Sequence, residues 1–234
     1  DVGLGKTIEG GLILSSLMSR DTIKRVLIIS PASLVTQWQI RLRTMFDIRF
    51  ADYTADADHP DKDFWNTHNL VIVSLQTIRA DSKGRHERLL NSEPWDLLIV
   101  DEAHHLNADE KMGPTLGYQL IEKMVKNQKI SSMVFFTGTP HRGKDFGFLS
   151  LLKLLDDRFN PKTEMQKQLQ YLPEVMIRNN KQNVTDLKGD RLFQAPKVTS
   201  EIYTYSEAEA KFYRKLTEFI IDGKAYASSL GVTE

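Results

Sequence analysis

Short runs of Val, Ile and Leu alternate along this chain with longer segments in which apolar residues recur at helical spacing. The runs predict buried strands, and the longer segments predict helices. The expected strands are residues 25–29, 70–73, 96–100 and 133–136, and the clearest expected helices are 8–18 and 34–46. This alternation predicts an α/β fold with a mostly parallel sheet flanked by helices. In such a sheet, ligands bind at the carboxyl ends of the strands.

The pattern changes near Asp157. After about Phe159 the short apolar runs stop and polar helical stretches follow, at residues 164–171 and 206–221. We therefore expect two parts, a lobe over residues 1–157 and a C-terminal helical extension or linker over residues 158–234.

Two local patterns refine this picture. Ser206 and Glu209 have the spacing of a capping box, which predicts the start of the last helix. Segment 51–63 is rich in Asp and Ala and carries no apolar run, so we expect a solvated surface loop there.

Composition excludes several classes of protein. Among 234 residues, 31 basic side chains balance 31 acidic ones, so the formal net charge is zero and any contact with a polyanion must be local. The absence of cysteine excludes disulfides, thiolate nucleophiles and cysteine-based metal sites, and it is typical of a reducing compartment. No apolar run approaches the ~18 residues of a membrane span, so no membrane contact is expected. The chain begins with Asp1 and shows no charged leader, and we expect it to be a fragment.

The start of the chain indicates a phosphate-binding loop, Gly3-Leu4-Gly5-Lys6-Thr7. In the motif G-x-x-x-x-G-K-S/T, glycines let backbone N–H groups approach phosphate, and the following helix presents its positive N-terminus. Lys6 would bind the β- and γ-phosphates, and the Thr7 hydroxyl would bind Mg²⁺. The alternative is an ordinary glycine-rich turn before a helix. The first glycine of the motif and the strand that feeds the loop would lie upstream of the first residue.

Two adjacent acids, Asp101 and Glu102, follow an apolar run at residues 97–100. In P-loop enzymes the first acid at such a strand end helps to bind Mg²⁺, and a following Glu can polarise the attacking water. Asp101 is therefore the candidate metal ligand, and Glu102 is the candidate general base. The alternative, an acidic turn that ends a strand, does not account for the Gly-Lys-Thr upstream.

Two other features are given structural interpretations. His104 and His105 do not indicate a zinc site, because adjacent residues do not converge on one ion and no further His or Cys cluster follows. Trp38 is expected to be a core residue and not a platform for stacking bases.

The motifs resemble the Swi/Snf-type, superfamily-two helicase-like ATPases, and the bacterial RNA-polymerase-associated branch is the most similar. Four blocks in the family's order carry the resemblance: residues 1–8 (DVGLGKTI), 30–38 (SPASLVTQW), 101–104 (DEAH) and 137–140 (TGTP). Two further blocks resemble a nucleic-acid motif and an arginine-bearing motif, 73–78 (VSLQTI) and 176–184 (MIRNNKQNV). The resemblance implies a RecA-like P-loop lobe that binds ATP and Mg²⁺.

The resemblance also implies roles for individual residues. Those in the nucleotide site are Gly3, Gly5, Lys6 and Thr7 for the nucleotide, Thr7 and Asp101 for the metal, and Lys6 and Glu102 for catalysis. Thr137 and Thr139 would couple the nucleotide state to the nucleic acid. The residues expected beside the nucleic-acid backbone are Pro31, Ser33, Gln37, Ser74, Gln76 and Arg178. Hydroxyls, amides and helix N-termini contact phosphates without a basic face. Helix capping and solvation are the alternative for Ser33 and Gln37.

Basic residues are concentrated in two places in the second half of the chain. One group is Arg178, Lys181, Lys188 and Arg191, for which a solvated linker face is the alternative. The other is His141 and Arg142, which follow the Thr-Gly-Thr-Pro block as in the bacterial branch. Arg142 is expected to contact DNA or a second lobe, with a surface salt bridge as the alternative.

The activity that the resemblance implies is ATP-dependent translocation on double-stranded DNA, which remodels protein–nucleic-acid complexes such as one containing RNA polymerase. The expected location is the cytoplasm in association with the nucleoid, with the nucleus as the alternative. Such a motor needs a second RecA-like lobe with arginine fingers, which are typically worth ~10³–10⁵ in rate. We therefore expect this fragment alone to hydrolyse ATP negligibly.

Other functions remain open. An RNA helicase of the DEAH type is one, although such helicases generally have Ser-Ala-Thr where residues 137–140 read Thr-Gly-Thr-Pro. A nucleotide-regulated binding module is another, but it has no chemical need for both Asp101 and Glu102. A simple P-loop kinase does not account for the block at 30–38.

Overall fold

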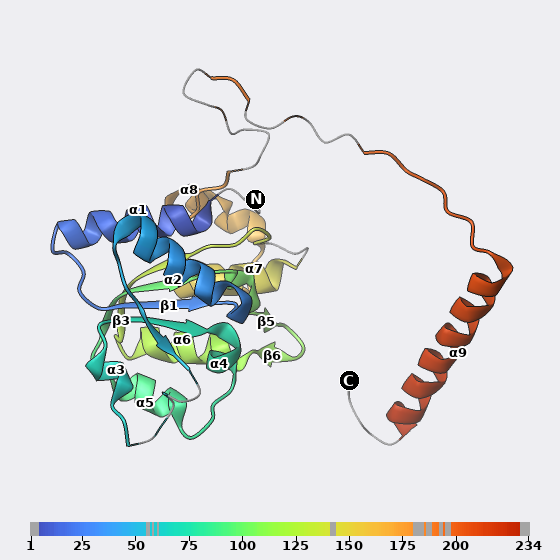
Figure 1. Ribbon diagram of the computed structural model, residues 1–234, viewed down its shortest axis with the longest axis horizontal. Coiled ribbons are helices and arrows are strands. Elements are labelled where there is room, and N and C mark those ends of the chain that lie inside the picture. The colour runs from blue at the N-terminus through green and yellow to red at the C-terminus, as the bar shows by residue number, and fades with distance from the viewer. Residues whose placement is uncertain are drawn as a thin grey trace. The chain divides into compact units, whose positions relative to one another are not determined.

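The structure is a computed structural model that describes residues 5–54, 57, 59, 61–140, 144–179, 185, 189–191, 194 and 198–229. The chain forms two compact units, Asp1–Leu192 and Phe193–Glu234. The first contains the sheet and its covering helices (Figure 1), and the second contains the long helix α9. The four strands predicted from apolar runs are all present.

A five-stranded parallel sheet in the order β2-β3-β1-β4-β7 forms the centre of the first unit. Its strands are β1 (Val26–Ser30), β2 (Ala51–Tyr53), β3 (Leu70–Ser74), β4 (Trp95–Val100) and β7 (Ile130–Phe135). All five residues of β1 are buried, since it lies between β3 and β4 and is covered on both faces.

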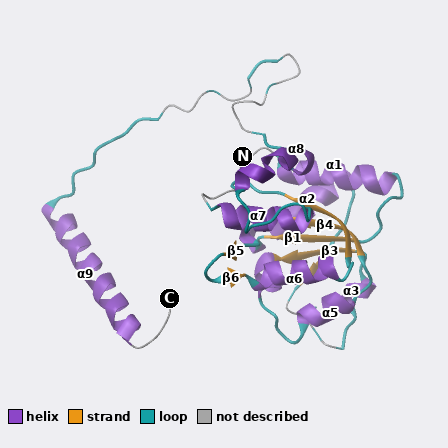
Figure 2. Cartoon of the chain, turned by 180° about the vertical axis from the view of Figure 1, so that it is seen from behind, coloured by secondary structure: helices purple, strands orange, loops and turns teal. Residues whose placement is uncertain are grey.

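Helices cover both faces of the sheet, as Figure 2 shows from behind. On one face, Ile28 packs in a cluster with residues of α1 (Lys6–Ser19) and α2 (Ala32–Phe46). On the other, Ile29 packs with residues of further helices. These helices are α4 (Leu75–Arg79), α5 (Arg85–Asn91), α6 (Leu116–Lys126) and α7 (Asp145–Leu155). The α/β fold predicted from the hydrophobic pattern is therefore confirmed.

The shorter elements lie between these layers or at their ends. They are α3 (Phe64–Thr67), the 3₁₀ turn η1 (Ala103–His105), the hairpin strands β5 (Ala108–Asp109) and β6 (Gly113–Pro114), η2 (Met165–Tyr171) and α8 (Leu172–Val175). Among the described residues, no helix is both long enough and apolar enough to cross a membrane.

Strand β2 corrects the expectation of a solvated loop over residues 51–63. It pairs in parallel with β3, and Tyr53 is buried and stacks on Trp65 with ring centroids 4.1 Å apart. Because β2 is a three-residue edge strand with one buried side chain, it leaves no apolar run in the sequence.

The first unit continues past residue 157, where the sequence suggested a soft boundary. Phe159 is buried against Phe148 and Leu152 of α7, and residues of η2 and α8 pack on the same cluster. Gln168 of η2 is buried and donates to the backbone oxygens of Asn160 and Thr163. Residues 158–175 therefore pack with α7 inside the first compact unit.

The second unit is described from its helix α9 (Glu207–Ser229) and the residues just before it. The backbone N–H of Glu209 donates to Ser206 Oγ, and the Glu209 carboxylate accepts from the backbone N–H of Ser206. This reciprocal pair confirms the predicted capping box.

Arg25 connects segments that lie near the amino ends of the strands, at the edge of the sheet opposite the candidate site. Its guanidinium donates to Trp65 O, Asn69 Oδ1 and Pro94 O and lies 4.4 Å from the centroid of the Trp95 ring. We expect Arg25→Ala to lower the free energy of unfolding by about 2–3 kcal/mol, since three hydrogen bonds and a cation–π contact are lost.

Urea denaturation of the chain measures this change. Arg25→Lys is the matched control, because lysine keeps the charge but cannot reach all three acceptors, so we expect an intermediate loss. Equal stability of the wild type and Arg25→Ala would contradict the prediction.

Candidate active site

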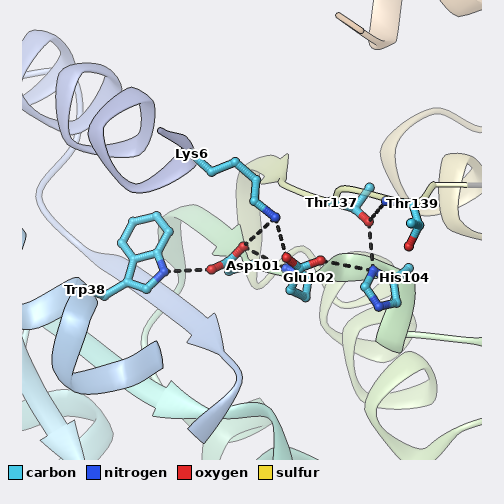
Figure 3. Close-up of polar contacts among 7 residues, drawn as sticks. All are labelled: Lys6, Trp38, Asp101, Glu102, His104, Thr137 and Thr139. Atoms are coloured by element: carbon cyan, nitrogen blue, oxygen red, sulfur yellow. Dashed lines mark hydrogen bonds and ion pairs between the residues drawn. The ribbon is translucent and has the colours of Figure 1, made fainter. Parts of the chain in front are cut away.

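The candidate residues gather at the carboxyl edge of the sheet. Strands β1, β3, β4 and β7 end at Ser30, Ser74, Val100 and Phe135. The segment that follows each of these strands carries predicted site residues. The strand order places β4 between β1 and β7, so its two acids lie between the start of α2 and the Thr137 segment. Sequence reasoning predicted this edge, and the structure brings the side chains together (Figure 3).

Lys6 reaches the acids from the N-terminus of α1. Gly5 precedes the helix with φ 84°, a left-handed conformation that glycine adopts without strain. The Lys6 Nζ forms an ion pair and hydrogen bond with Glu102 Oε1 and lies 3.6 Å from Asp101 Oδ1. Thr7 follows in the first helical turn and is 7% exposed. Lys6, the start of α1 and the two acids therefore form one cluster.

Asp101 is held from two sides although it is almost fully buried. Its Oδ2 accepts a 2.8 Å hydrogen bond from Nε1 of Trp38, and its Oδ1 accepts a 2.9 Å bond from the backbone N–H of Glu102. A buried carboxylate is costly unless it is hydrogen-bonded, so these two donors offset part of the cost of burying Asp101.

Glu102 occupies a strained backbone position, with φ 48° and ψ 48° in the left-handed region that disfavours non-glycine residues. Burial acts to raise the pKa of its carboxyl. The hydrogen bond and charge of Lys6, the charge of His104 and a backbone hydrogen bond from Gly138 outweigh burial and hold this pKa below its ordinary value. Glu102 is therefore ionised near neutral pH.

His104 connects the acids to the segment after β7. Its Nδ1 lies 3.2 Å from Glu102 Oε2 and 2.8 Å from Thr137 Oγ1. Thr137 Oγ1 also accepts a 3.2 Å hydrogen bond from the backbone N–H of Thr139. The backbones are joined as well, because Ala103 N–H donates to Phe136 O. The two threonines predicted to couple the site are thus in polar contact with it through His104.

Apart from Arg178, the candidate nucleic-acid residues lie at the carboxyl ends of β1 and β3 and in the helices α2 and α4 that follow these strands. Pro31 immediately precedes α2, and Ser33 is exposed in its first turn. Gln76 Oε1 accepts a 3.0 Å hydrogen bond from the backbone N–H of Ala32, which joins α4 to the start of α2. Ser74 Oγ accepts a hydrogen bond from the backbone N–H of Thr77 and caps α4. Helix capping, which was the alternative role given above for Ser33 and Gln37, is therefore a role of Ser74.

Gln37 is exposed on α2, one turn beyond Ser33. Arg178 is exposed in the segment after α8, and among the described residues no hydrogen bond or ion pair joins it to the other candidates. The remaining sequence candidates lie outside the described residues: Gly3, His141, Arg142, Lys181 and Lys188.

The donor set suits Mg²⁺, which prefers oxygen ligands and usually binds one or two carboxylates together with phosphates and water. Asp101 supplies a carboxylate, and Thr7 supplies a hydroxyl beside Lys6. Within the described part of the chain, no group of three His, Cys, Asp or Glu side chains could hold a metal ion.

Similarity to known proteins identifies the family. The family described as SNF2-related domain matches residues 1–231. The chain belongs to the SNF2-related family. RNA polymerase-associated protein RapA of Pasteurella multocida (strain Pm70) is 37% identical over 183 residues, which are 74% of this chain and 18% of that protein. RapA of Klebsiella pneumoniae (strain 342) is 37% identical over 179 residues, with the same shares. This SNF2-related domain thus spans about a fifth of the length of these curated relatives.

Solved structures share the fold. The Sulfolobus solfataricus SWI2/SNF2 ATPase core in complex with dsDNA matches with a TM-score of 0.52 and 23% identity, over 67% of this chain and 30% of that chain. A second structure, the Sulfolobus solfataricus SWI2/SNF2 ATPase core domain, matches with a TM-score of 0.50 and 23% identity, over 67% of this chain and 29% of that chain. The resemblance to Swi/Snf-type ATPases is confirmed.

Two residues of the SNF2-related domain contribute more than the sequence suggested. Trp38 is a core residue as predicted, with no exposed surface, but its N–H also binds Asp101. Beyond its place in the block 101–104, the sequence indicated no role for His104 except in a rejected zinc pair, yet His104 bridges Glu102 and Thr137. Its position in the Asp-Glu-Ala-His block, one turn from the acids, was the available signal.

Close packing of α1 on α2 positions Lys6. A Cβ on Gly10 would lie 2.7 Å from Cη2 of Trp38, whose ring is buried and fixed by Asp101. We expect Gly10→Ala to lower the free energy of unfolding by about 1–2 kcal/mol, because overpacking outweighs the ~1 kcal/mol gain in helix propensity.

Thermal or urea unfolding measures this loss, with Gly11→Ala as the matched control. A Cβ on Gly11 would lie 2.1 Å from Cε2 of Phe46, but this residue ends α2 and is partly exposed, so we expect its ring to rotate toward solvent. We expect a smaller loss for that variant, and the reverse order would contradict the prediction.

Proposed function

We propose that this domain is the ATP-binding lobe of an ATP-dependent double-stranded DNA translocase that remodels protein–nucleic-acid complexes. The observation that carries the proposal is the convergence of Lys6, at the N-terminus of α1, on Asp101 and Glu102 at the end of β4. A cation, two carboxylates and a helix N-terminus are the parts that phosphoryl transfer requires.

The residues take different roles in the proposed reaction. The N-terminus of α1 and Lys6 bind the triphosphate, while the Thr7 hydroxyl and the Asp101 carboxylate hold Mg²⁺. Bound Mg²⁺ neutralises charge that develops on the phosphate oxygens. Glu102 orients the attacking water and accepts its proton at a carboxylate oxygen, which is available because its pKa lies below the ordinary value.

Coupling to DNA is proposed to pass through His104. When Lys6 moves from Glu102 to a phosphate, the Glu102 carboxylate loses its neighbouring positive charge. The electrostatic potential at His104 then changes, because His104 Nδ1 lies 3.2 Å from Glu102 Oε2. Through Thr137, that change would reach the segment that follows β7. By this local step, the bound nucleotide would alter the affinity of the domain for nucleic acid.

The proposed DNA track is the strip after β1 and β3. It presents the N-terminus of α2, the Ser33 hydroxyl and the Gln37 and Gln76 amides, which contact phosphates without reading base sequence. The SWI2/SNF2 core that shares the fold is described in complex with dsDNA, which supports duplex DNA as the substrate. Arg178 would add one cation to this surface.

The complete motor would include a second RecA-like lobe with arginine fingers, so the present domain alone is proposed to hydrolyse ATP negligibly. The name of the RapA relatives, RNA polymerase-associated protein, supports a complex containing RNA polymerase as the target. We place the protein in the cytoplasm in association with the nucleoid.

ATP hydrolysis by the full-length protein tests the proposal, without nucleic acid and with duplex DNA, single-stranded DNA or RNA. Stimulation that is largest with duplex DNA and absent in Glu102→Gln is the expected result. Stimulation by RNA alone would indicate an RNA helicase instead. No hydrolysis under any condition would favour a nucleotide-regulated binding module.

A further inference from the structure

Trp38 lies where three parts of the site meet. It belongs to α2 and is fully buried, and its indole ring covers Gly10 of α1 closely enough to leave no room for a Cβ. The ring of Phe136, which directly precedes Thr137, is 6.3 Å away between centroids. The indole N–H donates to Oδ2 of Asp101 at 2.8 Å.

The other two tryptophans show that packing alone does not require this hydrogen bond. Trp65 and Trp95 are as deeply buried as Trp38, yet among the described residues the Nε1 of each has no hydrogen-bond partner. The tryptophan beside the acids is the one whose donor is used, and its acceptor is the candidate metal ligand. The contact is therefore specific to the site.

We propose that Trp38 is a positioning residue that fixes the orientation of the Asp101 carboxylate and makes it respond to the position of α2. With Oδ2 held by the indole N–H, Oδ1 is the oxygen directed toward Lys6, where Mg²⁺ and phosphates would bind. The same helix begins at Ala32 beside the proposed DNA track. A shift of α2 on DNA binding would move the indole and with it the carboxylate.

This inference rests on the proposed function, because it assigns Trp38 to the Mg²⁺ site of that function. Residues that orient a metal ligand typically change metal affinity or activity 10–100-fold when they are replaced. A merely structural tryptophan would alter the amount of folded protein and leave the Mg²⁺ requirement of the folded fraction unchanged. The two roles therefore differ in a measurable quantity.

The test uses Trp38→Phe in the full-length protein, with Trp65→Phe as the matched control. Phenylalanine keeps an aromatic ring in the core but removes the N–H donor, whereas Trp65 has no donor contact to lose. Calorimetry measures ADP binding over a series of Mg²⁺ concentrations and does not depend on hydrolysis. We expect the half-saturating Mg²⁺ concentration to rise about tenfold in Trp38→Phe and to stay unchanged in Trp65→Phe.

A second measurement tests the link to α2. By reciprocity, duplex DNA that shifts α2 changes the half-saturating Mg²⁺ concentration of the wild type, and Trp38→Phe abolishes that change. An unchanged Mg²⁺ requirement in Trp38→Phe, or an equal rise in Trp65→Phe, would overturn the inference while leaving the proposed function intact. A wild type that binds no nucleotide at any Mg²⁺ concentration would overturn both.

Discussion

Replacing Glu102 with Gln is expected to lower kcat for ATP hydrolysis by the full-length protein about 10³-fold, the range in which a general base typically contributes. Glutamine has the same shape and can still accept hydrogen bonds at its carbonyl oxygen, but it cannot take a proton from water. Nucleotide affinity should change only a few-fold, because Lys6, Thr7 and Asp101 remain. Steady-state kinetics and calorimetric ADP binding separate these two effects.

Glu110→Gln is the matched control, since Glu110 is an exposed acid in the turn between β5 and β6. We expect its kcat to equal that of the wild type. A Glu102→Gln enzyme that retains a tenth or more of wild-type kcat would remove Glu102 from the catalytic role.

Replacing Lys6 with Ala is expected to weaken nucleotide binding by the full-length protein about 100-fold, equivalent to about 2.7 kcal/mol. Two effects contribute in the same direction. The phosphates lose a cation, and the adjacent Asp101 and Glu102 carboxylates lose the cation that they share, so they repel a triphosphate more strongly. Lys126→Ala is the control, because Lys126 forms a surface ion pair with Glu122. Unchanged affinity in Lys6→Ala would contradict the assignment of the phosphate-binding loop.

The same variant carries a pH signature in the stability of the chain. In the folded protein the pKa of Glu102 lies below its ordinary value of 4.5, with Lys6 as the main lowering influence against burial. A carboxyl group whose pKa is lowered by folding stabilises the folded state fully when the pH is above the pKa of that group in the unfolded chain. This stabilisation is lost as the pH falls through the pKa of the group in the folded protein. We therefore expect the stability difference between the wild type and Lys6→Ala to be constant near neutral pH and to shrink below about pH 4.5. Urea denaturation between pH 3 and pH 7 measures it.

Repetition of buried apolar residues made the four longer strands predictable from sequence. Strand β4, for example, is a run of apolar residues that ends at two acids. Strand β2 was missed because a short edge strand buries a single side chain and leaves no run. The spacing of apolar residues in the sequence thus predicts the strands and helices in which buried positions recur regularly.

The contacts inside the site were not predictable in the same way. The Trp38–Asp101 hydrogen bond joins residues 63 positions apart, and the His104–Thr137 contact joins residues 33 apart. Each depends on the order of strands in the sheet and on a side-chain rotamer, neither of which leaves a periodic pattern in sequence. Burial predicted for Trp38 was right because it follows from helical spacing, whereas the partner of its N–H does not.

The left-handed backbone at Glu102 has a consequence for attempts to make the protein more heat-resistant. A non-glycine residue in that conformation costs about 1–2 kcal/mol, and here the cost falls on the residue assigned to activate water. Glycine would remove the strain at that position, but it would also remove the carboxylate and the partner of Lys6. Selection for thermal tolerance without selection for turnover would therefore leave position 102 open to substitution. Engineering should instead target positions remote from the carboxyl edge of the sheet.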